Sequence, residues 1–312
     1  MDYTIKAFVF GAGYGTRLQP LTHIRPKVCV PVAGQPAIFY AIDRIVDAGI
    51  NHCVINLHHL PDIVKNTIGD GSRWGIDVSY SFEKQILETG GALKYAEHKL
   101  SADYILIYNG DIVTDVDICG VIENHRQSGA AATLVCASWC EPKQITIGCN
   151  NNSIIDIRNS LTAGRVPSHT FLGIHVINRD VIDCIPPHQK ISIIPVYLDL
   201  IKQGFKINCF DYAEGHWYDI GTIQSYTQAN QSLLESRKVD LVTGQTSRLS
   251  ESVKCTGYVV IGDGVVVEDD VELNNTIIWD NVLIKKGVRL SECIVTDNVV
   301  VATSHTECLL LE

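Results

Sequence analysis

The sequence predicts an α/β fold with a mostly parallel sheet, followed by a smaller module built from a short repeat. Three observations predict this architecture. Short apolar segments alternate with amphipathic helical segments over most of the chain. Glycines and acidic residues directly follow several of these segments, as they do at the carboxyl ends of parallel strands in ligand-binding sheets. From Val259 onward, apolar residues recur every six positions, which is typical of stacked coils of short strands.

The composition limits size, partners and compartment. A chain of 312 residues is long enough for one large α/β domain and a smaller module. Its net charge of −10 argues against nucleic acid or an anionic membrane surface as a partner. An acidic protein that binds a polyphosphate must gather cations locally and use a metal, and Arg17, Arg25 and Lys27 fit that need. The 11 cysteines lack metal-binding spacing, and no signal peptide or membrane span is visible, so reduced thiols and a cytoplasmic location are expected.

The first predicted element is a buried strand from Ile5 to Phe10. A loop with three closely spaced glycines follows it: Gly11, Gly13 and Gly15. Such glycines let the backbone turn sharply and present bare N–H groups, which form a phosphate site at a strand-to-helix turn. Two cations come next, Arg17 and Lys27, with prolines between them. We therefore expect a polyphosphate cradle with two fixed cations.

Closely spaced glycines also occur in three other kinds of loop. The simplest is a glycine-rich turn without a ligand. A dinucleotide fold would need a regular helix after the glycines and an acidic residue about 20 positions later, but Pro20 and Pro26 interrupt that helix. A Walker loop would end in Gly-Lys-Ser or Gly-Lys-Thr, and this loop does not.

The order Gly-x-Gly-x-Arg, Pro-x-Thr and Pro-Lys between Gly13 and Lys27 resembles the signature of the sugar-1-phosphate nucleotidyltransferases. The resemblance covers most of the chain. It implies a Rossmann-like, GT-A-like catalytic domain over residues 1–236. It also implies that Arg17 holds the departing pyrophosphate and that Lys27 neutralises the α-phosphate. The implied backbone donors to the nucleotide are Gly11, Ala12, Gly13 and Gly15.

Alternating helices and strands continue beyond the signature. We expect a helix between Pro36 and Gly49, a strand at Cys53–Leu57, a helix at Leu60–Ile68 and a strand at Val78–Ser81. The next dense motif, Leu87–Leu93, opens a helix with two adjacent glycines. These indicate either close approach of a ligand or a helix capped at Thr89 with glycines for tight packing. The resemblance implies that Gly90 and Gly91 neighbour the nucleotide and that Glu88 meets the nucleotide or the sugar.

A clear buried strand at Tyr104–Tyr108 ends in Asn109, Gly110 and Asp111. A carboxylate at the carboxyl end of such a strand is a hard oxygen donor suited to Mg²⁺, although a simple turn aspartate has the same sequence pattern. The resemblance implies that Asp111 binds the metal and that Asn109 binds the sugar.

The middle of the chain lacks one motif of the family. We expect a strand at Ala130–Ser138 and then a hairpin, formed by Gln144–Cys149 and Ser153–Ile157 with Asn150–Asn152 as its turn. Many family members carry a Glu-Lys pair near here, whose lysine holds the sugar phosphate. The nearby cations Lys143 and Arg158 do not fit that motif, so the clamp for the sugar phosphate stays open.

Two later motifs complete the predicted catalytic domain. The strand Thr170–Val176 contains Gly173, and a glycine inside a strand often marks close approach of a ligand; the resemblance implies contact with the sugar. The segment Gly215–Thr222 contains Asp219, which the resemblance makes the second metal ligand and which in isolation would read as a helix cap. The other elements expected here are a helix at Ile193–Ile201, a strand at Lys206–Asp211 and a helix at Gln224–Ser236.

The tail has a different pattern. Residues 237–251 are polar and predict a linker. In residues 252–312 the apolar positions with six-residue spacing are Ile261, Val267 and Leu273 and, after a one-residue slip, Ile278, Ile284 and Leu290. The period resembles the hexapeptide repeat of a left-handed parallel β-helix. Two to three coils are too few to stand alone, so we expect the tail to pack on the catalytic domain or on another subunit, making a homo-oligomer.

The resemblance implies Mg²⁺-dependent transfer of a nucleoside monophosphate from an NTP to a sugar 1-phosphate. Local motifs are similar to the N-acetylmuramate-1-phosphate uridylyltransferase branch, whereas the tail is similar to mannose- or heptose-1-phosphate guanylyltransferases, so base and sugar stay open. A non-catalytic subunit that senses nucleotide sugars is the alternative, but it usually has a degraded signature. An acyltransferase would need more coils and a histidine among them, and only His305 lies in the tail.

Overall fold

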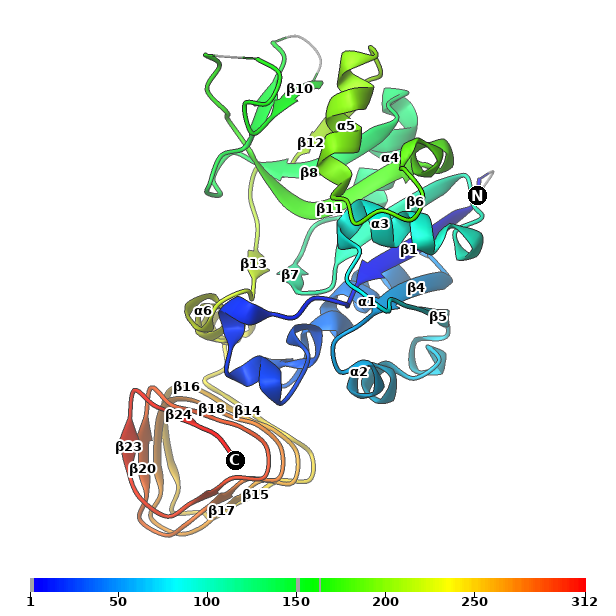
Figure 1. The fold of residues 1–312 in the computed structure, drawn as a ribbon. Helices are drawn as coiled ribbons and strands as arrows, with labels where there is room; N and C mark the ends of the chain where they lie inside the picture. Colours follow the sequence, from blue (N-terminus) through cyan, green and yellow to red (C-terminus); the bar gives the residue numbers. More distant parts are fainter. Residues whose placement is uncertain (1–2, 150–151, 163) are drawn as a thin grey trace. The chain divides into compact units, whose positions relative to one another are not determined.

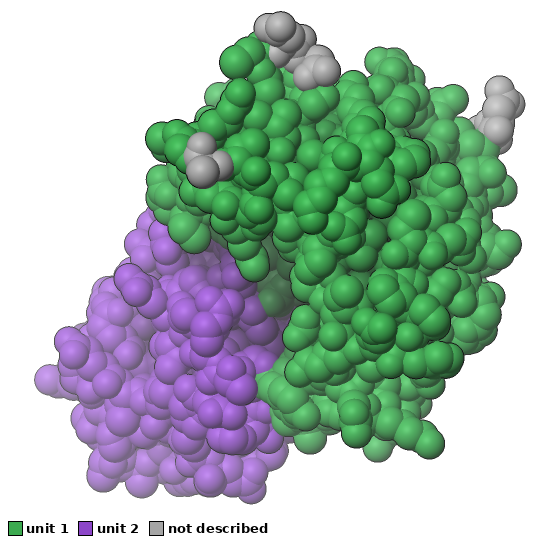
Figure 2. All heavy atoms as spheres, turned by 45° about the horizontal axis from the view of Figure 1, so that its top comes forward, with its two compact units in different colours: residues 1–14, 38–217 green, residues 15–37, 218–312 purple. Residues whose placement is uncertain are grey.

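The computed structural model describes residues 3–149, 152–162 and 164–312. It consists of two compact units (Figure 2). Unit 1 comprises residues 1–14 and 38–217, and unit 2 comprises residues 15–37 and 218–312. Two segments of the predicted catalytic domain, residues 15–37 and 218–236, thus belong to the same compact unit as the tail. The signature itself is divided, since its first glycines belong to unit 1 and its cations to unit 2.

Unit 1 is built on a seven-stranded sheet with the order β12-β8-β11-β6-β1-β4-β5 (Figure 1). Its strands are β1 (Ile5–Phe10), β4 (His52–Leu57), β5 (Asp77–Phe82), β6 (Tyr104–Asn109), β8 (Ala132–Ala137), β11 (Thr170–Asn178) and β12 (Ile207–Asp211). All neighbouring strands run parallel except β11, which is antiparallel to both β6 and β8. The predicted α/β fold with a mostly parallel sheet is confirmed.

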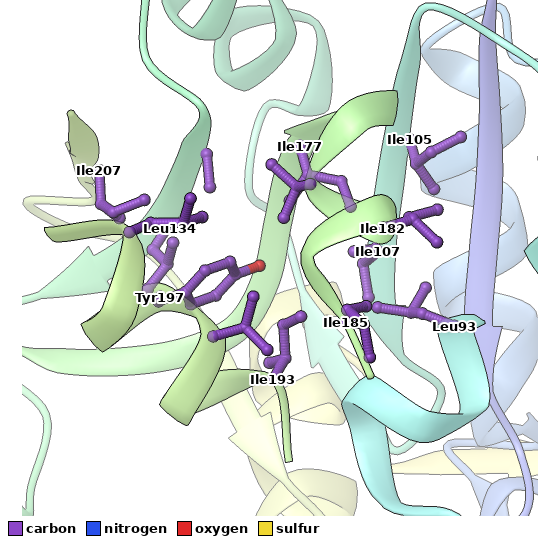
Figure 3. Close-up of a cluster of buried hydrophobic side chains, with 14 of the residues drawn as sticks. Leu93, Ile105, Ile107, Leu134, Ile177, Ile182, Ile185, Ile193, Tyr197 and Ile207 are labelled. Atoms are coloured by element: carbon purple, nitrogen blue, oxygen red, sulfur yellow. The ribbon is translucent and has the colours of Figure 1, made fainter. Parts of the chain in front are cut away.

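Helices flank this sheet. They are α1 (Ala37–Asp47), α2 (Pro61–Ile68), α3 (Glu88–Tyr95), α4 (Ile118–Ser128) and α5 (Ile193–Lys202). Helices α3 and α5 share one apolar core with alternate residues of the strands, among them Ile105, Ile107 and Leu134 (Figure 3). Tyr197 of α5 lies fully buried in the same core. Because successive strand residues point to opposite faces of a sheet, the residues between these point away from α3 and α5.

Helix α4 packs on that other face through a buried histidine. The His125 ring bonds the Thr133 hydroxyl at 2.9 Å and the Asn178 side chain at 3.0 Å. Burial lowers the pKa of His125 to about 4, because the charged ring would lose its hydration there. A second buried histidine, His175 on β11, has a pKa lowered to about 3 for the same reason. Unit 1 therefore holds two neutral histidines in its interior.

Shorter elements complete unit 1. They are β7 (Ile112–Thr114), β9 (Ile145–Ile147), β10 (Ile154–Ile157) and the 3₁₀ helices Ser72–Trp74, Glu97–Lys99 and Arg179–Cys184. Strands β9 and β10 pair antiparallel, as the predicted hairpin requires. Of its predicted turn, Asn150 and Asn151 lie outside the described residues. Strand β13 (Trp217–Asp219) runs into unit 2.

In unit 2 the signature segment forms short turns instead of a long helix, as its prolines predict. Its elements are the 3₁₀ helices Thr16–Leu18, Leu21–His23 and Lys27–Cys29, followed by β2 (Pro31–Val32) and β3 (Gln35–Pro36). Helix α6 (Ile223–Arg237) begins at a capping box, in which the Thr222 hydroxyl accepts the Ser225 N–H and the Ser225 hydroxyl accepts the Thr222 N–H.

The tail forms stacked parallel strands, visible in Figure 1 as coils of triangular section. They are β14 (Leu241–Thr243), β15 (Arg248–Leu249), β16 (Lys254–Ile261), β17 (Val266–Val267), β18 (Glu272–Ile278), β19 (Leu283–Ile284), β20 (Arg289–Ser291), β21 (Ile294–Val295), β22 (Val300–Val301), β23 (His305–Thr306) and β24 (Leu309–Leu310). Leu241 pairs with Val259 and Val266 with Leu283, so one coil takes 18 or 17 residues. These sheets are compatible with the predicted β-helix.

The structure of the tail departs from the prediction in one place and explains the predicted slip in another. Residues 237–251, expected as a linker, contribute β14 and β15, which pair with β16 and β17. The predicted one-residue slip is a bulge in β16. Thr256 pairs with Asn274 but Val259 pairs with Thr276, so two residues face one. Gly257 in this bulge has φ +65°, and a Cβ there would lie 1.9 Å from the Asn275 side-chain oxygen.

The apolar residues that predicted the repeat, from Ile261 to Leu290, are buried inside the coils. All cysteines in the described parts of the chain are free, as expected for reduced thiols. Within the same described ranges, no helix combines the length and the apolar character that crossing a bilayer requires.

Candidate active site

The predicted site residues fall into two groups, one in each unit. The unit 2 group centres on Asp219. The Lys27 ammonium donates to Asp219 Oδ1 at 3.1 Å, and Arg17 Nη2 lies 3.6 Å from Asp219 Oδ2. The Lys27 side chain is only 11% exposed, whereas that of Arg17 is 67% exposed. Two predicted catalytic cations and a predicted metal ligand are thus brought together, with Lys27 held and Arg17 open to solvent.

Two glycines make room for this cluster. Gly15 has φ +62°, and a Cβ there would lie 2.7 Å from Thr22 Cγ2 and 3.1 Å from Lys27 Cβ. At Gly221 a Cβ would lie 2.6 Å from Arg17 Nη2 and 2.9 Å from Asp219 Oδ1. Gly15 was predicted as a site residue from the sequence, whereas Gly221 was not. Its position two residues after Asp219 could have indicated a role beside that carboxylate.

Arg25, expected among the phosphate-binding cations, is engaged elsewhere. Its guanidinium donates to Asp297 through Nε and Nη2 at 2.7 and 2.6 Å, and to Asp280 through Nη2 at 2.5 Å. The side chain is 18% exposed. Both carboxylates lie on the coils of the tail, so the structure removes Arg25 from the set of cations for a phosphate.

In unit 1 the first signature glycine is tied into the protein. The Gly11 N–H donates to the Asn56 side-chain oxygen at 2.8 Å, so this amide is already paired. Ala12 is buried. Gly13 has open space where a Cβ would project, which suits close approach of a ligand. Gly13 therefore fits the role of backbone donor better than Gly11, and the nucleotide contacts of these residues stay a prediction.

A buried polar chain continues from Asn56. Its amide donates to Glu83 Oε1 at 2.7 Å, and Glu83 Oε2 accepts the Leu87 N–H at 2.8 Å. The His58 ring bonds the Glu83 carbonyl at 2.8 Å and the Tyr14 hydroxyl at 2.9 Å. Burial raises the pKa of Glu83, although the bonds from Asn56 and Leu87 act in the opposite direction. This chain joins the glycine loop to the start of α3.

Sequence analysis missed Glu83 and Asn56. Glu83 directly follows β5 and Asn56 lies near the end of β4. Acidic or amide residues at the carboxyl ends of parallel strands are a signal that was used for Asp111 but not for these two.

The predicted sugar-binding residues Asn109 and Gly173 lie side by side. Gly173 has φ +78°, and a Cβ there would lie 2.5 Å from the Asn109 amide nitrogen. The strand register on β11 shifts at this point. Asp111 lies two residues after the end of β6 and is half-buried. The end of β6 thus carries three predicted ligand-binding groups, whose roles stay predictions.

The glycines of α3 have a packing role. The N–H groups of Gly90 and Gly91 both donate to the Ile191 carbonyl, at 2.9 and 3.0 Å. A Cβ on Gly91 would lie 2.4 Å from the Gln189 carbonyl oxygen. The packing alternative raised from the sequence therefore explains why glycines stand here, and contact with a nucleotide stays a prediction. Glu88, also predicted near the ligand, is exposed, and its Oε1 lies 3.9 Å from Lys190 Nζ.

The clamp for the sugar phosphate stays open in the structure as well. The Lys143 ammonium donates to the carbonyls of Ser138 and Cys140. Arg158 Nε donates to the Gln144 side chain at 3.3 Å. Both cations are thus paired within their own loop region.

Comparison with known proteins identifies the family. The family model described as nucleotidyl transferase matches residues 6–236 of the chain. The chain belongs to the nucleotidyl transferase family. The divided signature, the Asp219 cluster and all of β1 except Ile5 lie inside the matched range.

Named relatives of this nucleotidyl transferase agree with the family. It is 26% identical over 88% of its length to the mannose-1-phosphate guanylyltransferase of Mycobacterium tuberculosis, covering 80% of that protein. It is also 26% identical to the UTP–glucose-1-phosphate uridylyltransferase of Synechocystis, with 86% of this chain and 76% of the relative covered. These findings confirm the family predicted from the sequence, the sugar-1-phosphate nucleotidyltransferases, and with it a transferase.

A solved structure shows the same fold. The structure described as a glucose-1-phosphate thymidylyltransferase of Bacillus anthracis in complex with sucrose superposes with a TM-score of 0.63. It is 23% identical and covers 72% of this chain, with 94% of its own chain covered.

Nucleotidyltransferases of this family typically use a divalent metal. In the part of the chain that the structure describes, no group of three or more His, Cys, Asp or Glu residues is placed to hold a metal ion. The predicted ligands Asp111 and Asp219 offer carboxylate oxygens, the donor type that hard divalent cations prefer. Asp219 also contacts the side chains of Lys27 and Arg17. The donor chemistry therefore fits a divalent ion.

Proposed function

We propose that this nucleotidyl transferase transfers a nucleoside monophosphate from an NTP to a sugar 1-phosphate and releases pyrophosphate, with Mg²⁺ as cofactor. The observation that carries the proposal is the cluster of Arg17, Lys27 and Asp219, in which two cations share one carboxylate. Cations held in this way are already oriented. Each can exchange its contact with the carboxylate for a contact with a phosphate, with little rearrangement of the surrounding protein.

The nucleophile of this reaction, a sugar-phosphate oxygen, is already an anion, so no side chain has to remove a proton. The barrier is repulsion between two anions, and lowering it requires positioning and neutralisation of charge. Lys27 neutralises the α-phosphate as the attacking oxygen approaches. Arg17, the more exposed cation, holds the leaving pyrophosphate. Mg²⁺, when held by Asp111 and Asp219, supplies further charge neutralisation on the phosphates.

Three groups of unit 1 would orient the substrates. Gly13 supplies a backbone donor for the nucleotide, while Asn109 and Gly173 form the contact surface for the sugar. For the substrates we propose GTP with a mannose- or heptose-like 1-phosphate, because relatives covering most of this chain are named mannose-1-phosphate guanylyltransferases. UTP with glucose 1-phosphate or N-acetylmuramate 1-phosphate is the competing pair, and a uridylyltransferase is among the relatives.

The test is pyrophosphate release by the full chain with five NTPs, each paired with a panel of sugar 1-phosphates, with and without Mg²⁺. One pair should give turnover that needs Mg²⁺ and that is lost in Lys27→Ala. Binding of a nucleotide sugar without any release of pyrophosphate would instead support the non-catalytic sensing subunit. Light scattering of the same sample tests the proposed homo-oligomer, since a monomeric mass would contradict assembly through the tail.

A further inference from the structure

Arg25 stands two residues before Lys27, and its side chain is held by the tail. Arg25 makes a bidentate contact with Asp297 and a single bond to Asp280, all of them short, and its guanidinium carbon lies 5.3 Å from the centre of the Trp279 ring. Trp279 itself is fully buried. A planar guanidinium matched to two carboxylates and a ring face has one defined position. All of these groups belong to unit 2.

The two carboxylates belong to a ladder that runs through successive coils. Asp263, Asp280 and Asp297 occupy equivalent corners 17 residues apart, and the N–H of each residue donates to the carboxylate of the next, at 2.8 and 3.0 Å. Neighbouring carboxylates in a ladder repel one another. Arg25 compensates the last two of them. Its pKa is raised because Asp297 and Asp280 together outweigh burial, which acts to lower it.

Helix α6 and Trp279 of the tail hold the same segment on the other side of Lys27. The Pro31 carbonyl accepts the buried Tyr226 hydroxyl at 2.7 Å, and that hydroxyl accepts the Trp279 N–H at 3.0 Å. The Ala33 N–H donates to the Asn230 side chain at 2.8 Å. A chain of bonds therefore runs from the tail through α6 back to the segment that carries Lys27.

We propose that Arg25 is a positioning residue for the transfer reaction, and that the tail holds the signature segment so that Lys27 stays in place. Lys27 lies between the anchors at Arg25 and Pro31, and its ammonium lies 3.1 Å from Asp219 Oδ1. The tail coils thereby become part of the support of the catalytic cation. The inference rests on the proposed function, because it assigns Lys27 a role in catalysis.

The experiment compares the full-length wild-type chain with Arg25→Gln, Asp297→Asn and Arg25→Lys. Asp263→Asn is the matched control, since it removes a carboxylate of the same ladder that accepts from Thr246. In Arg25→Gln and Asp297→Asn we expect kcat to fall about 10- to 100-fold, as for a displaced catalytic group. The KM for the NTP should stay within about threefold, because a transition-state interaction is lost. Arg25→Lys should recover part of kcat, and Asp263→Asn should retain it.

Hydrogen exchange of residues 28–37 gives a readout that does not depend on activity. The Val30 amide donates to the Lys27 carbonyl and the Ala37 amide to the Val30 carbonyl, so both should exchange faster in Arg25→Gln and Asp297→Asn. Unchanged exchange, or faster exchange with an unchanged kcat, would overturn the inference.

If the wild-type chain releases no pyrophosphate with any substrate pair, the proposed function fails separately. In that case the inference is tested by hydrogen exchange of residues 28–37 and by NTP binding, measured as a thermal shift. If Arg25→Gln changes neither of them, the inference is overturned.

Discussion

The predicted site residues of the two units differ in kind. In unit 1 most of them are glycines and amides, joined by Asp111 and Glu88, and the glycine loop is fixed by the buried bonds from Gly11 to Asn56 and on to Glu83. In unit 2 they are charges, with Lys27 and Arg17 facing Asp219. Buried hydrogen bonds hold geometry, whereas ion pairs at a partly exposed surface can be exchanged for those of a ligand. Unit 1 is therefore expected to lose stability when its site network is changed, and unit 2 to lose turnover.

The largest expected effect comes from Lys27→Ala in unit 2. Removing this cation should lower kcat about 100-fold or more, since Lys27 is the side chain proposed to neutralise the α-phosphate. The free energy of unfolding should change little, because Asp219 remains partly exposed and close to Arg17. Steady-state pyrophosphate release and urea unfolding measure the two quantities. Lys285→Ala, which removes an exposed lysine paired with Glu268, is the control and should keep full activity.

Glu83→Gln probes the opposite expectation in unit 1. Each Glu83 oxygen accepts one hydrogen bond, so an amide nitrogen in place of one oxygen faces a donor. The free energy of unfolding should fall by about 1–3 kcal/mol, the cost of leaving a buried polar group unpaired. Urea unfolding with Glu214→Gln as an exposed control gives the measurement. A variant as stable as the wild type would show that the network does not hold unit 1 together.

Two glycines of unit 1 separate packing from ligand contact. Gly91→Ala should destabilise the chain by about 1–2 kcal/mol, because the new Cβ meets the Gln189 carbonyl. Gly13→Ala should leave stability unchanged, since its Cβ would project into open space, and should raise the KM for the NTP. Thermal unfolding and kinetics on both variants decide the matter. The reverse pattern would support Gly91 as a ligand neighbour and contradict that role for Gly13.

The smallest expected effect is a pH dependence confined to unit 1. His125 and His175 have pKa values lowered to about 4 and about 3, so they stay neutral in the folded chain where the unfolded chain takes up protons. The unfolding free energy should therefore decrease as the pH falls below about 6.5. Each histidine should account for about 1 kcal/mol between pH 7 and pH 5.5.

His175→Phe should flatten this slope by one histidine's share. An unchanged slope in His175→Phe would contradict the assignment.

Local patterns predicted most of the sheet. Strand β1 runs from Ile5 to Phe10 as expected, and β6 and β12 lie within a residue of their predicted bounds. These segments are strongly apolar and end at glycine or acidic residues, so local sequence decides them. The six-residue period of the tail was visible for the same reason. The first coil strands, β14 and β15, were missed because their short polar sequences become strands only by pairing with the next coil.

The candidate site was predictable as a set of residues but not as a set of pairings. The resemblance predicted Arg17, Lys27 and Asp219 as site residues, yet nothing in the sequence separated Arg25 from the other two cations. That separation depends on Asp297, which lies 272 positions along the chain. Similarly, Gly90 and Gly91 differ from Gly13 only in what surrounds them. Contacts between segments distant in sequence determine these roles, and a single sequence does not record them.

The aspartate ladder has an evolutionary consequence. Because its members repeat every 17 residues, deletion of one residue between Asp280 and Asp297 would shift the later corner and turn its carboxylate away from Arg25. A chain with every signature residue intact would then behave as a catalytic mutant. Selection should therefore preserve the length of this coil as strictly as the signature. Homologous chains with such coils should change positions 25, 280 and 297 together.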